Sequence, residues 1–146
     1  MSIIRSDNQA DSLKMLKLVI ETRDYYRAMA ELLAEQNLQN SLDEIANERA
    51  TYIEPFENVV RQLGELPAKP DPDKEFMQQL GGEITKLFSS DSTNSILDRC
   101  LDKEQELAEV LNQSSLAEQS ADFKSLLNAL AKHVQNTKKQ LHALKS

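Results

Sequence analysis

The chain has 146 residues, and its 17 Lys and Arg face 24 Asp and Glu, which gives a net charge of −7. The single Cys excludes an internal disulfide and any zinc or iron–sulfur site built from several cysteines, and the acidity argues against nucleic-acid binding, which needs a basic surface. With only three Gly and four Pro, the composition is typical of one helical domain over residues 1–146.

The N-terminus and the hydropathy pattern indicate a soluble, cytoplasmic protein. The first residues lack the apolar run of a secretory signal. No apolar stretch approaches the roughly 20 residues that a membrane-spanning helix needs. We therefore expect no membrane insertion.

Apolar residues at helical spacing predict a first helix over residues 8–36. The main stripe recurs every three or four residues and consists of Met15, Val19, Thr22, Tyr26, Met29 and Leu33. A second apolar edge consists of Leu13, Leu16 and Ile20. This edge exceeds what one core face requires, so we expect it to contact the middle segment of the chain, a protein partner or a second copy of the chain.

A second helix is predicted over residues 41–63. Ser41 and Glu44 have the spacing of an N-terminal capping box, and Gly64 suits the position just after a helix end. Pro55 lies inside this pattern, where it removes one backbone N–H and crowds the carbonyl group four residues earlier. We therefore expect one helix that is kinked at Pro55.

The rest of the sequence predicts a connector, a short helix and a second pair of long helices. Three prolines between residues 67 and 72 favour an extended connector. Further helices are predicted over residues 73–88, 92–112 and 117–145. Short links at 37–41 and 113–117 make each pair of long helices an antiparallel hairpin, and the long connection 65–91 can cross the bundle from end to end. This arrangement is that of an all-α, ferritin-like four-helix bundle.

The ligand pattern of a ferritin-like di-iron centre is absent from these helices. Such a centre needs inward-facing glutamates and Glu-x-x-His pairs, but only Glu48, Glu104 and His133 lie on or near an apolar face. Arg49 lies in the middle of the second helix's stripe, where its charge would repel a divalent ion. We therefore expect no di-metal centre, no cofactor and no catalytic residue. A mononuclear site at Glu48, Glu104 and His133 remains the alternative.

Arg49 and Glu104 are ionisable residues on mostly apolar helix faces. Because an unpaired buried charge costs several kcal/mol, the sequence predicts an interior ion pair between them, with Glu48 and Tyr52 completing a polar cluster. Two interpretations stay open. The pair either fixes the register of the helices or belongs to a pocket in which Arg49 binds a small anion.

Charge is distributed unevenly along the chain. Residues 117–146 carry five lysines against two acidic residues, whereas the preceding segments are acidic. A basic helix among acidic helices predicts attraction within the bundle, or else a docking site for an acidic partner.

Four stretches resemble a family of small bacterial ferritin-like proteins without an established activity. They are residues 26–31 (YRAMAE), 47–52 (NERATY), 63–67 (LGELP) and 96–104 (ILDRCLDKE). The resemblance covers almost the whole chain and implies a ferritin-like bundle in which Glu48-Arg49-Ala50 stands without the ferritin histidine. Thr22 and Arg23 depart from the family, which has small or acidic residues there.

The sequence as a whole favours a non-enzymatic bundle that binds a partner or itself, in a stress-related setting. The alternative is a ferritin relative that binds metal at a degenerate or mononuclear site. Elemental analysis separates the two.

Overall fold

In the computed structural model, which describes residues 6–67, 78–82 and 93–145, all regular structure is helical. The elements are α1 (Asp7–Leu32), the 3₁₀ turn η1 (Ala34–Gln36), α2 (Gln39–Ala50), α3 (Ile53–Gln62), α5 (Thr93–Gln113), the 3₁₀ turn η2 (Leu116–Glu118) and α6 (Ala121–Leu144). Residues 78–82 form a short helical segment between α3 and α5. The predicted all-α class is confirmed.

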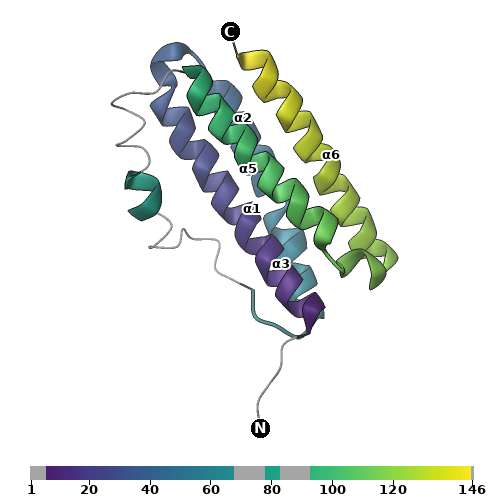
Figure 1. Cartoon of the computed structure of the whole chain (residues 1–146). Helices are drawn as coiled ribbons and strands as arrows, with labels where there is room; N and C mark the ends of the chain where they lie inside the picture. The colour runs from purple at the N-terminus through teal and green to yellow at the C-terminus, as the bar shows by residue number, and fades with distance from the viewer. Residues whose placement is uncertain (1–5, 68–77, 83–92, 146) are drawn as a thin grey trace.

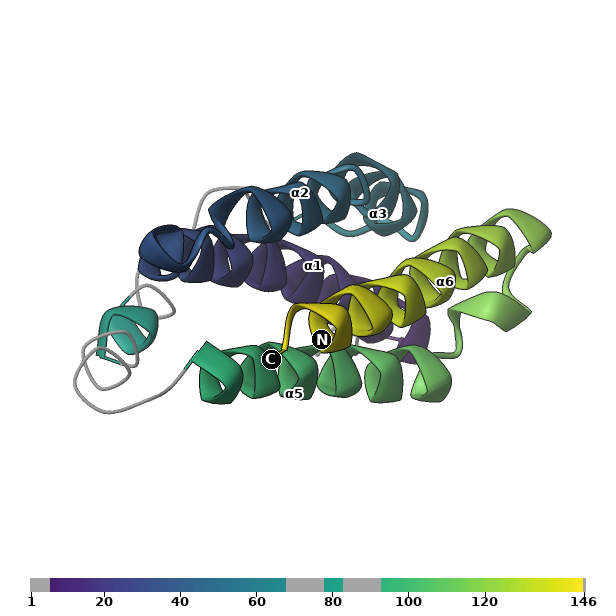
Figure 2. The ribbon, with the colours of Figure 1, turned by 90° about the horizontal axis from the view of Figure 1, so that it is seen from above.

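The long helices form two antiparallel hairpins that lie side by side (Figures 1 and 2). The first hairpin pairs α1 with α2 and α3, and the second pairs α5 with α6. The start of α5 lies at the end of the bundle opposite to the end of α3, so α3 and α5 run in the same direction (Figure 1).

Several predicted boundaries shift because of local turns. The first helix ends at Leu32 instead of residue 36, because residues 34–36 form the 3₁₀ turn η1. Asn37 ends that turn in a left-handed conformation with φ of 61°, which Asn tolerates better than most residues. The last helix begins at Ala121 instead of residue 117, because Ser120 caps it by accepting a hydrogen bond from the backbone N–H of Phe123 at 3.0 Å. Of the helix predicted over 73–88, all but 78–82 lies outside the described residues.

The helix predicted over residues 41–63 has the expected irregularity near Pro55, but this takes the form of a break between α2 and α3 at Thr51 and Tyr52, which both keep right-handed helical backbone angles. At the break, the N–H groups of Thr51 and Tyr52 bond to carbonyl groups only three residues back, at 3.1 Å each. Pro55 then falls in the first turn of α3, where a helix needs no N–H donor. The break therefore places the proline at a position that tolerates it.

The core consists of two apolar clusters, one toward each end of the bundle. The first contains Met15, Leu16, Val19, Ile20, Ile53, Phe56, Val59, Val60, Leu107, Leu116, Phe123, Leu127, Leu130 and Val134. The second contains Tyr25, Tyr26, Met29, Ala30, Leu33, Leu42, Ile45, Ala46, Leu80, Ile96, Leu97, Cys100 and Leu141. The buried polar residues Thr22, Arg49 and Glu104 lie between the two clusters in sequence on their respective helices.

The second apolar edge of α1 is used inside the chain. Leu16 and Ile20 are buried in the first cluster, and Leu13 packs against it. The expectation that the middle segment covers this edge is wrong where the structure describes that segment, because Leu80 belongs to the second cluster. The packing of side chains between the hairpins thus accounts for the edge without a partner.

Candidate functional site

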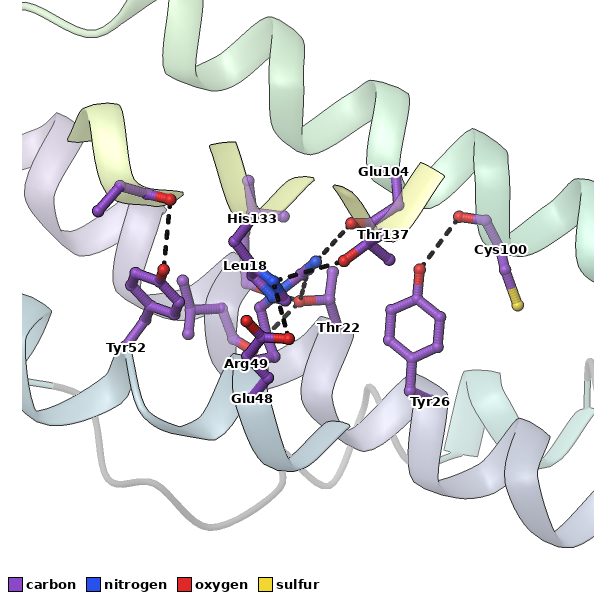
Figure 3. A network of polar contacts seen from close by, with 12 residues as sticks. Leu18, Thr22, Tyr26, Glu48, Arg49, Tyr52, Cys100, Glu104, His133 and Thr137 are labelled. Atoms are coloured by element: carbon purple, nitrogen blue, oxygen red, sulfur yellow. Dashed lines mark hydrogen bonds and ion pairs between the residues drawn. The ribbon is translucent and has the colours of Figure 1, made fainter. Parts of the chain in front are cut away.

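A layer of buried polar side chains crosses the middle of the bundle (Figure 3). Each long helix contributes to it: α1 provides Thr22, α2 provides Arg49, α5 provides Glu104, and α6 provides His133 and Thr137. These side chains project inward because their positions continue the apolar stripe of each helix.

Arg49 is the centre of this layer, and it is fully buried. Its Nη2 forms an ion pair with Oε1 of Glu104, so the structure brings the two predicted partners together. Its Nη1 donates to Oγ1 of Thr22 at 2.9 Å, and its Nε donates to Nε2 of His133 at 3.0 Å. All three guanidinium nitrogens are therefore engaged, each by a different helix.

Thr22 links the guanidinium to the backbone of α1. Its Oγ1 accepts the hydrogen bond from Arg49 and lies 2.8 Å from the carbonyl oxygen of Leu18. Because a hydroxyl group has a single proton, that proton is donated back to α1. The threonine thus serves as an acceptor for the cation while its own donor stays satisfied.

His133 is held neutral by its surroundings. Since Nε2 accepts from Arg49, the proton of the neutral ring lies on Nδ1, which is 3.5 Å from Oε2 of Glu48 and 3.5 Å from Oγ1 of Thr137. Burial, and then the nearby Arg49 charge, lower the pKa of His133 to about 4. The ring stacks on Tyr52, with centroids 5.3 Å apart and planes 13° from parallel.

Two tyrosines border the layer on opposite sides. The Arg49 guanidinium lies 5.8 Å from the ring centroid of Tyr26, within the range of a cation–π contact. The Tyr26 hydroxyl donates to the carbonyl oxygen of Cys100 at 3.5 Å, and burial, together with the Glu104 carboxylate, raises its pKa. The Tyr52 hydroxyl donates to the carbonyl oxygen of Ala129 at 3.2 Å, and burial with the nearby Glu48 charge raises its pKa.

The predicted cluster is therefore present in altered form. Glu48 is exposed and faces His133 instead of Arg49, and Tyr52 contacts the ring of His133. The sequence reasoning missed Thr22 and His133 as direct partners of Arg49. The signal that pointed to them was the guanidinium itself, since its five N–H donors need more acceptors than one carboxylate offers.

The three side chains of the alternative mononuclear site do not converge on an empty position. The Arg49 guanidinium contacts both Glu104 and His133 and uses one lone pair of each. Within residues 6–67, 78–82 and 93–145, no group of three or more His, Cys, Asp or Glu side chains could hold a metal ion. Oε2 of Glu104 is buried and has no hydrogen-bond partner among the described residues.

Comparison with protein-family models, curated proteins and solved structures finds no match to this chain. The assignment of a function therefore depends on the geometry alone. In the part of the chain that the structure describes, no helix is long and apolar enough to cross a membrane.

Proposed function

We propose that this chain is a non-enzymatic, ferritin-like helical bundle that acts by binding another protein, and that its midsection is closed by an ion-pair layer instead of a di-metal centre. The observation that carries the ion-pair layer of this proposal is the position of Arg49. It is fully buried in the middle of the bundle and bound to three other helices.

The ferritin-like arrangement is supported by the order and direction of the helices. Two antiparallel hairpins with a single long connection between them are typical of that fold, and here α3 and α5 run in the same direction (Figure 1). The stretches at 26–31, 47–52, 63–67 and 96–104 that resemble the bacterial family lie on or beside these helices.

The polar layer occupies the place where ferritin-like relatives build a metal site from facing helices. A metal ion there would compete with Arg49 for Oε1 of Glu104 and Nε2 of His133, and it would have to approach a fixed positive charge. The other candidate carboxylate, Glu48, is exposed and its Oε2 lies beside Nδ1 of His133, while Arg49 holds Nε2 of the same ring. These contacts favour a structural function for the layer over metal-dependent oxidation or storage.

The same contacts favour the register-fixing interpretation over an anion pocket. An anion would have to displace Glu104 from Arg49 in a fully buried position. Sliding one helix by a turn would instead leave Arg49 or Glu104 unpaired among apolar side chains, which costs several kcal/mol. The layer thus disfavours every register but one.

Elemental analysis of protein purified from metal-replete medium tests the proposal. We expect iron, manganese and zinc each far below one ion per chain, before and after incubation with the free metals. A stoichiometric metal that is lost in the Glu104→Ala and His133→Ala variants would overturn the proposal in favour of the mononuclear site. A matched variant, Glu109→Ala on the exposed side of α5, controls for unspecific binding to carboxylates.

A further inference from the structure

One exposed stripe of α6 carries only basic and neutral side chains, and the single acidic residue of this helix, Asp122 in its first turn, lies outside the stripe. The stripe consists of Lys124, Asn128, Lys132, Gln135, Lys139 and His142, which fall within an arc of about 80° at roughly 100° per residue. No acidic residue lies on this stripe, although the chain contains 24 of them. Charge on α6 is therefore segregated to one side.

The helix's other lysines are used inside the chain. Lys138 donates to Gln105 at 2.6 Å, and Lys145 pairs with Asp98 at 2.5 Å, both across the contact with α5. Lys124, Lys132 and Lys139 pair with no described side chain. Attraction within the bundle thus accounts for the lysines on the α5 side of α6 and leaves the outward three unexplained.

The spacing of these three lysines limits what they can bind. They are eight and seven residues apart, which corresponds to about 12 Å and 10.5 Å along a helix. Carboxylates at heptad spacing on a second helix lie about 10.5 Å apart, which equals one lysine separation and is within about 1.5 Å of the other. Since surfaces normally intersperse both signs of charge, a stripe of one sign is a feature that guides association.

A nucleic acid fits this stripe less well than an acidic helix. Duplex DNA carries one charge per roughly 1.7 Å, far denser than three lysines over more than 20 Å of helix. The chain as a whole is acidic, and Glu44 and Glu48 are exposed on neighbouring α2. An extended polyanion would therefore meet repulsion that a single narrow helix avoids.

We propose that the outward face of α6 docks an acidic helical segment of a partner protein, with carboxylates at heptad spacing opposite Lys124, Lys132 and Lys139. This inference rests on the proposed protein-binding function and specifies its surface. His142 at the end of the stripe adds a donor near the C-terminus of α6, where positive charge is favoured.

The test uses a fluorescent alanine- and glutamine-based helical peptide with a glutamate at every seventh residue. We expect the wild-type chain to bind it at about 50 mM salt and more weakly at about 200 mM, as screening requires. The triple variant Lys124→Gln, Lys132→Gln, Lys139→Gln should bind about tenfold more weakly, because it removes three exposed ion pairs that are each weak.

A control variant separates the surface from the overall charge. Lys14→Gln, Lys17→Gln, Arg27→Gln removes the same charge from exposed positions of α1 and should leave peptide binding within about twofold of wild type. In the wild-type chain, backbone amide shifts induced by the peptide should map to residues 124–142, which locates the site without any variant.

The inference would be overturned by no binding at low salt, by an equal loss of binding in the α1 control, or by duplex DNA binding at least as tightly as the peptide. Salt-sensitive self-association of the free chain through α6 would also overturn it, because the occupant would then be a second copy. None of these results changes the metal content, so a failure of this inference is distinguishable from a failure of the proposed function.

Discussion

At Arg49, the cost of burying a guanidinium is offset by three hydrogen-bonding partners from three other helices. A buried charge without a partner destabilises the fold strongly, whereas a buried ion pair adds only modest net stability. The main consequence of these contacts is structural specificity, because only one arrangement of the four long helical segments gives Arg49 all three partners.

We predict that Arg49→Met destabilises the chain by about 3–5 kcal/mol, because it leaves Glu104 as a buried, unpaired charge. The double variant Arg49→Met with Glu104→Leu should recover most of that loss, since neither charge remains. Urea unfolding measures both free energies. A Glu104→Ala variant as stable as wild type would contradict the pairing.

His133 predicts a pH dependence of stability. Its folded pKa of about 4 lies below the unfolded value near 6.5, so the unfolded chain takes up the proton first as the pH falls. The histidine's contribution is therefore fully present above about pH 6.5 and is lost between there and about pH 4, up to about 3 kcal/mol in total.

The measurement is urea unfolding at several pH values, beside ring ¹⁵N shifts that follow each histidine. His133→Gln keeps an acceptor for Arg49 and removes the titration, so its stability should change less over the same window. Titration of His133 near pH 6.5, the value of an unperturbed histidine side chain, would contradict the buried contact with Arg49.

Part of this site could be predicted from the sequence. Ionisable residues on apolar stripes must find partners, so Arg49 and Glu104 could be paired from helix periodicity alone. Thr22 and His133 could not be assigned, because which acceptor meets which guanidinium nitrogen depends on the rotation and separation of packed helices. Glu48 and Tyr52 were placed in the correct region but with the wrong contact.

Among the elements, the junction of α2 and α3 shows how one residue alters a helix. The stripe on residues 41–63 continues through Pro55, so the pattern predicts a single helix, whereas the proline favours the start of a new one. The break also brings Tyr52 onto the ring of His133. It could be predicted that Pro55 disturbs the helix and roughly where. Whether the helix kinks or breaks depends on tertiary contacts.

We predict that Pro55→Ala joins α2 and α3 into a more continuous helix, because residue 55 regains an N–H that can bond to the carbonyl group of Thr51. Backbone chemical shifts and amide exchange over residues 51–55 measure the change. The matched control Pro67→Ala, outside the helices, should leave these signals unchanged. If the break persists in Pro55→Ala, its cause is the set of Tyr52 contacts and not the proline.

For the whole molecule, helix order and hairpin pairing could be predicted because link lengths restrict which helices lie beside each other. The helix ends at Leu32 and Ala121 were missed because short 3₁₀ turns, η1 and η2, directly adjoin the α-helices at these two ends. The position of Leu80 was missed because a long connection leaves many docking sites open. The second apolar edge of α1 belongs to the core. The surface that we propose for partner binding is therefore the basic stripe of α6.

The most direct test of the account is anomalous diffraction from crystals of the protein grown with Fe(II) or Mn(II). We expect continuous density for the Arg49 guanidinium between Glu104 and His133, with no anomalous peak in the layer. One or two ions bound to Glu104 and His133, with Arg49 turned away, would contradict the closed ion-pair layer.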